Sequence, residues 1–239
     1  MNELKLSKRL EAVTSYIPKN SILADIGSDH AYLPCYAYLQ GMIERAVAGE
    51  VVEGPYQSAL DQVRRTELSH VIDVRKGDGL EVISPNEVTC ITIAGMGGTL
   101  IQTILEKGKE KLAGVQRLIL QPNIGSKKVR EWLLSNGWEL TAEKILDDEG
   151  RIYEILVADR GDSEKPYLNN KEAGLLMGPF LSNEKNDIFV RKWTNEREHW
   201  TKIVSQLEEA PVTDANEKKK AELKAKIKLV EEELGIENS

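Results

Sequence analysis

Residues 23–34 read LADIGSDHAYLP, and this stretch decides how the first part of the chain is interpreted. An apolar run ends at Asp25 and is followed by Gly27, as at the end of a parallel β-strand that enters a tight turn. Asp29 and His30 then stand where nucleotide-binding loops usually have further glycines. The turn therefore carries acidic and imidazole side chains, which do not favour an anionic phosphate.

The segments that follow alternate between strand patterns and helix patterns. Apolar runs typical of strands in a sheet buried on both faces occupy 22–26, 45–51, 71–76, 88–94 and 117–121. Helical patterns occupy 3–16, 31–41, 56–69, 99–111 and 126–136. Residues 137–161 contain two longer strand patterns around the turn sequence DDEG. The order predicts a doubly wound α/β sheet that ends in an antiparallel hairpin, a Rossmann-like methyltransferase fold rather than a dehydrogenase.

The pattern changes after residue 160, and we expect two domains, 1–160 and 161–239. Residues 161–183 are rich in Gly, Pro and Asn and are typical of a linker with a short helix. Apolar residues then recur at near-heptad spacing in two segments, Phe189, Trp193, Trp200, Val204 and Leu207, and Leu223, Ile227, Val230 and Leu234. This spacing predicts a C-terminal antiparallel helical hairpin, a short coiled coil.

The chain carries 32 basic and 39 acidic residues, a formal net charge of −7. This balance argues against a general polyanion coat, but local basic patches can still bind nucleic acid. Three such clusters are present: Lys5, Lys8 and Arg9; Lys127, Lys128 and Arg130; and Lys218, Lys219, Lys220, Lys224 and Lys228. Each cluster can alternatively be an ordinary solvent-exposed helix face.

The sequence contains no apolar stretch long enough for a membrane span and no apolar core of a signal peptide near its start. Cys35 and Cys90 lie inside apolar segments and have no metal-ligand spacing. We therefore expect a cytoplasmic protein with two buried, reduced thiols and no metal.

Polar or glycine-rich residues follow every predicted parallel strand. Because carboxyl ends of parallel strands meet at one edge of a sheet, these residues predict a ligand site there. Glu50 follows the second strand, at the offset from the first glycine turn where an acidic residue binds ribose hydroxyls. Asp78 follows the third strand and is expected to bind an adenine amino group. A solvated strand-end carboxylate is the other interpretation of Glu50.

Charge discriminates between the possible ligands. Asp25 and Asp29 would repel the pyrophosphate of a dinucleotide, but they attract the sulfonium and ammonium groups of S-adenosylmethionine. Gly27 permits close approach of the backbone to that cofactor. Asp29 can alternatively be the N-cap of the following helix.

The stretch AGMGG at 94–98 has more glycines than a tight turn requires. It lacks the Pro-rich motif usual in amino-methyltransferases and leaves room for a flat base, with Gln121 or Asn123 to supply amide contacts. The predicted cofactor-binding residues are Arg9, Asp25, Gly27, His30, Glu50, Val51, Asp78, Gly79, Ala94, Gly95, Met96 and Gln121.

Several of these motifs occur together in one known family. In this order, ADIGSDHAYLP, GEVVEGPYQSA, KGDGL, ITIAGMGG and QPN resemble the bacterial tRNA adenine-N1 methyltransferases that modify adenine 22. The likeness covers residues 3–160, and the helical hairpin fits the coiled-coil tail of that family. The resemblance implies a Rossmann-like catalytic domain, S-adenosylmethionine as methyl donor and tRNA as substrate.

Under this resemblance the candidate catalytic residues are Asp29, His30, Tyr32 and Asn123. Asp29 and His30 are the titratable groups beside the cofactor, and Tyr32 or Met96 can stack on the target base. His30 can instead cap the helix. Adenine N1 normally lies in a base pair, so we expect the base to be flipped out.

Other functions are compatible with the same sequence. A methyltransferase of another RNA, a protein or a small molecule would share the cofactor, and a non-catalytic RNA-binding protein could keep a residual pocket. An NAD dehydrogenase is disfavoured by the missing glycines. We expect a monomer, but the hairpin can serve either tRNA binding or dimerisation.

Overall fold

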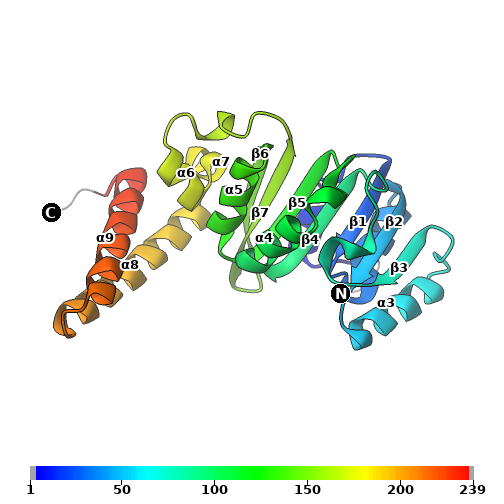
Figure 1. Cartoon of the computed structure of the whole chain (residues 1–239), viewed down its shortest axis with the longest axis horizontal. Helices are drawn as coiled ribbons and strands as arrows, with labels where there is room; N and C mark the ends of the chain where they lie inside the picture. Colours follow the sequence, from blue (N-terminus) through cyan, green and yellow to red (C-terminus); the bar gives the residue numbers. More distant parts are fainter. Residues whose placement is uncertain (1–3, 237–239) are drawn as a thin grey trace. The chain divides into compact units, whose positions relative to one another are not determined.

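The computed structural model describes residues 4–236, and the chain divides into two compact units, Met1–Lys165 and Pro166–Ser239 (Figure 1). The first unit contains all seven strands of the described chain in one sheet, and the second is helical. No helix of this part of the chain has the length and apolar character needed to cross a membrane.

The sheet has the strand order β3-β2-β1-β4-β5-β7-β6. Its strands are β1 Ser21–Ile26, β2 Ile43–Glu50, β3 Ile72–Lys76, β4 Cys90–Gly97, β5 Arg117–Ile124, β6 Trp138–Asp148 and β7 Arg151–Arg160. Strands β1 to β5 pair in parallel, whereas β7 is antiparallel to both β5 and β6. The predicted α/β sheet ending in an antiparallel hairpin is therefore confirmed.

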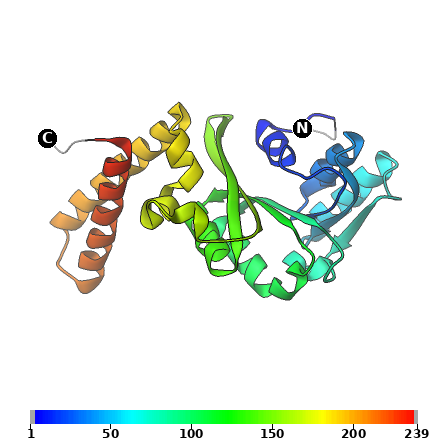
Figure 2. The ribbon, with the colours of Figure 1, turned by 90° about the horizontal axis from the view of Figure 1, so that it is seen from above.

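Helices cover both faces of this sheet. They are α1 Lys8–Thr14, α2 Tyr32–Leu39, α3 Glu53–Arg65, α4 Gly98–Lys107 and α5 Ser126–Ser135, with short 3₁₀ turns η1 Asp29–Ala31, η2 Gly79–Val82 and η3 Lys109–Leu112. Helices α2 and α3 lie on one face and α4 and α5 on the other (Figure 2). Buried side chains of α1, α2 and α3 pack against the first face in one apolar core. The free cysteines Cys35 and Cys90 are both buried, as predicted.

Three predicted helices have clearly different bounds, and the one predicted over 56–69 lies earlier in the chain, at Glu53–Arg65. The first begins at Lys8 rather than residue 3, because the Ser7 hydroxyl accepts a hydrogen bond from Leu10 N at 3.3 Å and caps the helix there. Residue 3 itself lies outside the described residues. The helix predicted over 99–111 ends at Lys107, because its C-cap residue Gly108 leaves the helical conformation, and η3 follows it.

Arg130 on α5 is buried and does not belong to a surface basic patch, so that part of the prediction was wrong. Its side chain has no exposed surface and bonds Glu143 Oε1 at 2.7 Å from Nε and Glu154 Oε2 at 2.8 Å from Nη2. The two carboxylates come from β6 and β7, so the triad ties α5 to the hairpin.

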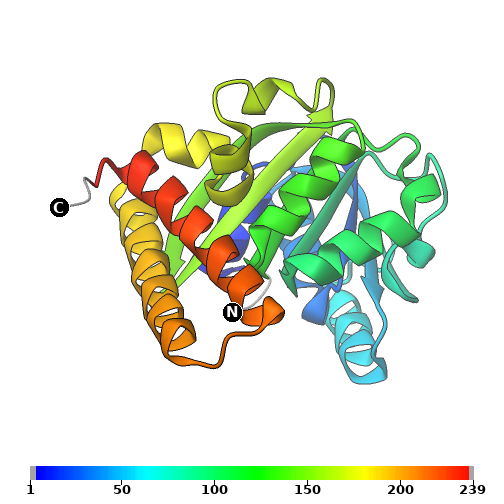
Figure 3. The same cartoon turned by 60° about the vertical axis from the view of Figure 1, so that its left-hand side comes forward.

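The second unit contains α6 Lys171–Met177, α7 Pro179–Glu184, α8 Asp187–Glu209 and α9 Asp214–Leu234, and η4 Lys165–Tyr167 spans the division between the units. Helices α8 and α9 form an antiparallel hairpin (Figure 3). Lys224 pairs with Glu208 near its turn, and Lys185 pairs with Glu233 at the other end, both at 2.8 Å. Phe189, Trp193, Val204, Leu223 and Val230 are buried along its length.

Candidate active site

A cavity of about 370 Å³ opens at the carboxyl edge of the sheet, beyond the ends of β1 to β4. It is lined by Arg9, Ile26, Gly27, Asp29, Gly49, Glu50, Val51, Gly77, Asp78, Gly79, Ala94, Gly95, Met96, Leu100 and Ile104. Most residues predicted to bind a cofactor are thus brought together at one place, together with the candidate catalytic Asp29.

Several predicted site residues lie outside this lining: Asp25, His30, Tyr32, Gln121 and Asn123. The lining also includes residues that the sequence reasoning missed, Ile26, Gly49, Gly77, Leu100 and Ile104. Gly49 and Gly77 directly precede the two predicted carboxylates, which is a signal that sequence could have given. Leu100 and Ile104 lie one turn apart on α4, where they are indistinguishable from ordinary core positions.

Glu50 has one carboxylate oxygen engaged by its own chain. Its Oε1 accepts hydrogen bonds from Val51 N at 2.9 Å and Val52 N at 3.1 Å. These contacts fix a side chain that is only 9% exposed and that lines the cavity. Oε2 accepts no hydrogen bond within residues 4–236, so it is available to a ligand that donates hydroxyl protons.

Asp25 has both oxygens engaged and lies beneath the turn rather than in the cavity. Oδ2 accepts from Ser28 Oγ at 2.5 Å and Oδ1 from Thr92 Oγ1 at 2.6 Å. Burial raises the pKa of this carboxyl above its ordinary value, while both hydroxyl bonds oppose the rise and the nearby Glu50 carboxylate adds to it. Asp25 therefore shapes the turn from β1 into Ser28.

The loop after Gly27 holds two consecutive non-glycine residues in the left-handed region, His30 with φ 57° and Ala31 with φ 50°. Such residues are held in place only where the surrounding structure fixes them, and they cluster at functional sites. The His30 ring stacks on Tyr32 with centroids 5.2 Å apart, and its Nε2 lies 3.4 Å from Asp29 Oδ1. Neither η1 nor α2 has a side-chain N-cap bond, so Asp29 and His30 are not helix caps.

Gly95 is a bulge in β4 whose backbone groups are taken by side chains of β5. The β4–β5 register shifts between Ala94 and Met96, which leaves Gly95 outside the ladder with φ 80°. Gly95 N donates to Gln121 Oε1 at 3.0 Å, and Asn123 Nδ2 donates to Gly95 O at 2.8 Å. Gln121 Nε2 in turn donates to Asn123 Oδ1 at 3.2 Å. The two amides thus shape the cavity wall.

Arg9 enters the cavity from α1 and is fixed by several partners. Its Nη1 donates to Gln121 Oε1, and its backbone N donates to Asp148 Oδ2 at 3.1 Å. The guanidinium also lies 5.3 Å from the ring centroid of Tyr153. Arg9 thus presents the only guanidinium among the described residues that line the cavity.

The cavity has an acidic lining, with Asp29, Glu50 and Asp78 against Arg9. Asp78 also begins η2 with a capping box, and its Oδ2 lies 3.6 Å from Lys107 Nζ. Three carboxylates and one guanidinium fit an adenosyl group that carries a sulfonium, an ammonium and one carboxylate, and they do not fit a pyrophosphate. Gly27 has a φ of 71°, in the left-handed region that favours glycine, and a Cβ there would displace the terminal methyl group of Met96.

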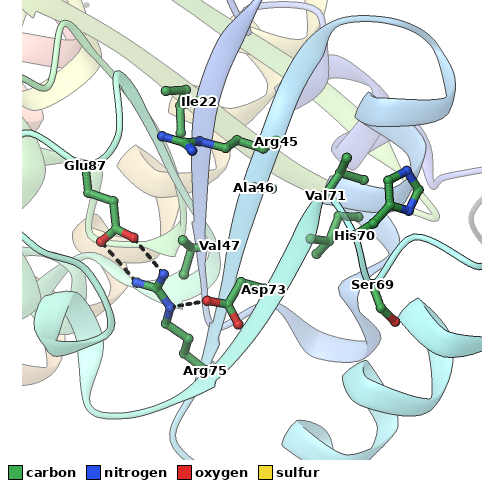
Figure 4. A pocket seen from close by; sticks show the side chains of 11 residues that line it. Ile22, Arg45, Ala46, Val47, Ser69, His70, Val71, Asp73, Arg75 and Glu87 are labelled. Carbon is green, nitrogen blue, oxygen red and sulfur yellow. Dashed lines mark hydrogen bonds and ion pairs between the residues drawn. The ribbon is translucent and has the colours of Figure 1, made fainter.

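A second hollow, of about 240 Å³, lies at the opposite edge of the sheet among the starts of β1, β2 and β3 (Figure 4). Its central Arg75 bonds Glu87 Oε1 at 2.6 Å and Asp73 Oδ2 at 2.7 Å. Because these charges compensate one another, this hollow lacks the acidic excess of the carboxyl edge.

A family model described as tRNA (adenine(22)-N(1))-methyltransferase matches residues 23–232 of the chain. The chain belongs to this family. A relative of that name from Bacillus subtilis (strain 168) is 52% identical over 233 residues, which cover 97% of this chain and 98% of the relative.

Solved structures agree with the family assignment. The crystal structure of the B. subtilis m1A22 tRNA methyltransferase TrmK is 50% identical, has a TM-score of 0.94, and the alignment covers 97% of this chain and 99% of that one. A Streptococcus pneumoniae protein solved in complex with S-adenosyl-L-methionine is 44% identical with a TM-score of 0.84, covering 96% and 100% of the two chains. The predicted family, methyltransferase activity on adenine N1 of tRNA, and S-adenosylmethionine as methyl donor are confirmed.

Proposed function

We propose that methyl transfer to adenine 22 takes place at the carboxyl-edge cavity, with the carboxylates of this chain holding the adenosyl group. Glu50 Oε2 accepts from the ribose hydroxyls, and Asp78 accepts from the adenine amino group. Leu100 and Ile104 pack against the adenine. The acidic lining carries this proposal, because three carboxylates and one guanidinium complement a zwitterionic, cationic ligand.

The methionine end of the cofactor lies toward Gly27, Asp29 and Arg9 in this proposal. Gly27 permits close backbone approach, Asp29 attracts the ammonium group, and Arg9 binds the carboxylate. Asp25 acts indirectly, since its bonds to Ser28 and Thr92 hold the turn that presents Gly27.

S-Adenosylmethionine supplies a methyl group bound to a positively charged sulfur. The chain contributes mainly position, because the in-plane lone pair of adenine N1 must point along the S–CH₃ bond. Asp29 stabilises the positive charge that develops on the methylated adenine. The His30–Tyr32 stack and Met96 form an aromatic and apolar wall for the base.

tRNA reaches this edge through exposed lysines in our proposal. Lys127 and Lys128 on α5 are about half exposed, and Lys218 and Lys219 on α9 form no ion pair within residues 4–236. Other lysines of α9 are partly neutralised, for example Lys228 by Glu232 at 3.6 Å. We place the reaction in the cytoplasm because tRNA is used there.

The test is incubation with labelled S-adenosylmethionine and unmodified bulk tRNA, followed by nucleoside analysis. We expect N1-methyladenosine as the labelled product, with tRNA affinity that falls as salt is added. An enzyme for small molecules would bind the cofactor without salt-dependent tRNA affinity. Binding of both ligands without N1-methyladenosine contradicts the proposal and favours a non-catalytic RNA-binding role.

A further inference from the structure

Ile124, the last residue of β5, is exposed at the edge of the sheet that carries the cavity. Its side chain is 76% exposed, whereas Leu118, Ile119 and Leu120 in the same strand are fully buried. A single exposed isoleucine is ordinary on a protein surface. What distinguishes Ile124 is the close packing of its backbone and its place in the chain next to Asn123, which bonds a residue of the cavity wall.

The backbone under Ile124 is fixed by close packing. Ile124 pairs with Gly97 in the β4–β5 ladder. A Cβ on Gly98, the residue after Gly97, would lie 2.1 Å from Gly125 O and 3.1 Å from Ile124 O. Position 98 therefore requires glycine for the two backbones to lie this close, and the contact fixes the backbone of Ile124 and Gly125.

The neighbours of Ile124 connect it to the cavity and to positive charge. The preceding residue, Asn123, donates to Gly95 O at 2.8 Å, and Gly95 lines the cavity. On the other side, Lys127 and Lys128 share a single partner, Glu131, at 3.8 Å and 3.1 Å. Two ammonium groups against one carboxylate leave a net positive charge that suits the RNA backbone.

The substrate requires an unstacking step. N1 lies on the Watson–Crick edge of adenine and is inaccessible while adenine 22 is stacked and paired in the D-arm. Proteins that open stacked nucleic acid insert apolar side chains between successive bases and hold the adjacent phosphates with cations. Ile124 and the lysine pair have this chemistry side by side.

We propose that Ile124 is the wedge that separates adenine 22 from its neighbours, with Lys127 and Lys128 holding the adjoining phosphates. The proposal rests on the function proposed above. Ile124 acts here on RNA stacking and takes no part in cofactor binding, so its contribution is confined to substrates in which adenine 22 is paired.

The test compares wild type with Ile124→Ala on two transcripts, one with adenine 22 paired and one with a mismatched opposite base. We expect kcat/KM of Ile124→Ala to fall roughly tenfold or more on the paired transcript and much less on the mismatched one. Ile124→Met should retain most of the activity. The matched control is Leu39→Ala, an exposed leucine (45%) at the far end of α2.

A second readout follows the unstacking itself. In a transcript with 2-aminopurine at position 22, wild type should raise the fluorescence, and Ile124→Ala should not, although both bind S-adenosylhomocysteine equally. An equal rate loss on both transcripts, or no loss on either, overturns the wedge. If wild type forms no N1-methyladenosine even on the mismatched transcript, the proposed function fails first, and the wedge fails with it.

Discussion

At the scale of single residues, Asp25 and Glu50 differ although each follows a parallel strand. Both carboxylate oxygens of Asp25 accept hydrogen bonds from hydroxyl groups of the protein. In contrast, Oε2 of Glu50 accepts no hydrogen bond from the described chain. A carboxylate that is satisfied internally supports the turn, and one that is half satisfied can bind a ligand. This difference is why we propose Glu50, rather than Asp25, as the residue that contacts the cofactor.

Glu50→Gln should raise the Kd for S-adenosylhomocysteine by roughly tenfold to a hundredfold. The amide oxygen can keep the bonds from Val51 N and Val52 N, but the charged acceptor for the ribose is lost, which costs about 1.5–3 kcal/mol. Titration calorimetry gives the value. Glu53→Gln is the control, because Glu53 is exposed and pairs with Lys76 outside the cavity. Equal affinities of the two variants would rule out the ribose contact.

Asp25→Asn should change how stability depends on pH. Below the ordinary pKa of 3.8 Asp25 is protonated in both the folded and the unfolded chain. Above it the unfolded chain ionises first, because burial raises the pKa in the folded state. The free energy of unfolding of wild type, relative to Asp25→Asn, should therefore decrease as pH rises from about 4. Denaturant titrations at several pH values check this, and an increase with pH would contradict it.

At the scale of elements, the junction of β4 with α4 requires glycine at position 98 more strictly than at position 97. A Cβ at Gly98 would meet Gly125 O, whereas nothing lies within 4 Å of a Cβ at Gly97. Gly98→Ala should lower the free energy of unfolding by about 1–3 kcal/mol through backbone displacement. Gly97→Ala should stay within about 0.5 kcal/mol. Similar losses in thermal or denaturant unfolding would show that the backbones are not packed as described.

The buried triad between α5 and the β6–β7 hairpin gives a second test at this scale. Arg130→Met leaves Glu143 and Glu154 without their shared guanidinium, which should cost about 3–5 kcal/mol of stability. Lys127→Met on the same helix removes an exposed charge and should change stability by less than about 0.5 kcal/mol. Denaturant unfolding distinguishes them, and a near-neutral Arg130→Met would contradict a structural role for the triad.

At the scale of the whole molecule, the sheet and its ligand edge could be predicted because parallel strands buried on both faces appear as continuous apolar runs. The ends of these runs then had to meet, which located Glu50 and Asp78 correctly at the cavity. Local sequence could not show contacts between distant segments. Arg130 follows two exposed lysines, and only the fold brings carboxylates from β6 and β7 onto it.

Backbone conformation was the other feature that sequence could not supply. Nothing in the residue types at 30 and 31 indicates a left-handed pair, because the tertiary environment imposes it. The bulge at Gly95 likewise depends on amides from β5 that replace the missing ladder bonds. Leu100 was missed because a half-exposed leucine on a helix gives no sign of a ligand.

Removal of the second unit should leave cofactor binding intact and weaken tRNA binding. The cut belongs after Lys165, because Ser163 Oγ bonds Leu134 O at 2.9 Å and Lys165 pairs with Glu139 at 3.0 Å within the first unit. We expect an unchanged Kd for S-adenosylhomocysteine and at least a tenfold rise for tRNA, from the lost lysine contacts. Unchanged tRNA affinity would assign the helical hairpin to another role, such as dimerisation.

The most direct measurement is a crystal structure of the protein with S-adenosylhomocysteine bound. We expect the ribose hydroxyls within hydrogen-bonding distance of Glu50, the adenine amino group near Asp78, and the sulfur close to Gly27. The sulfur should face the Gly95 bulge from a distance that leaves room for an adenine. A nucleoside bound in the reverse direction, or in the hollow around Arg75 at the opposite edge, would contradict the proposed cofactor site.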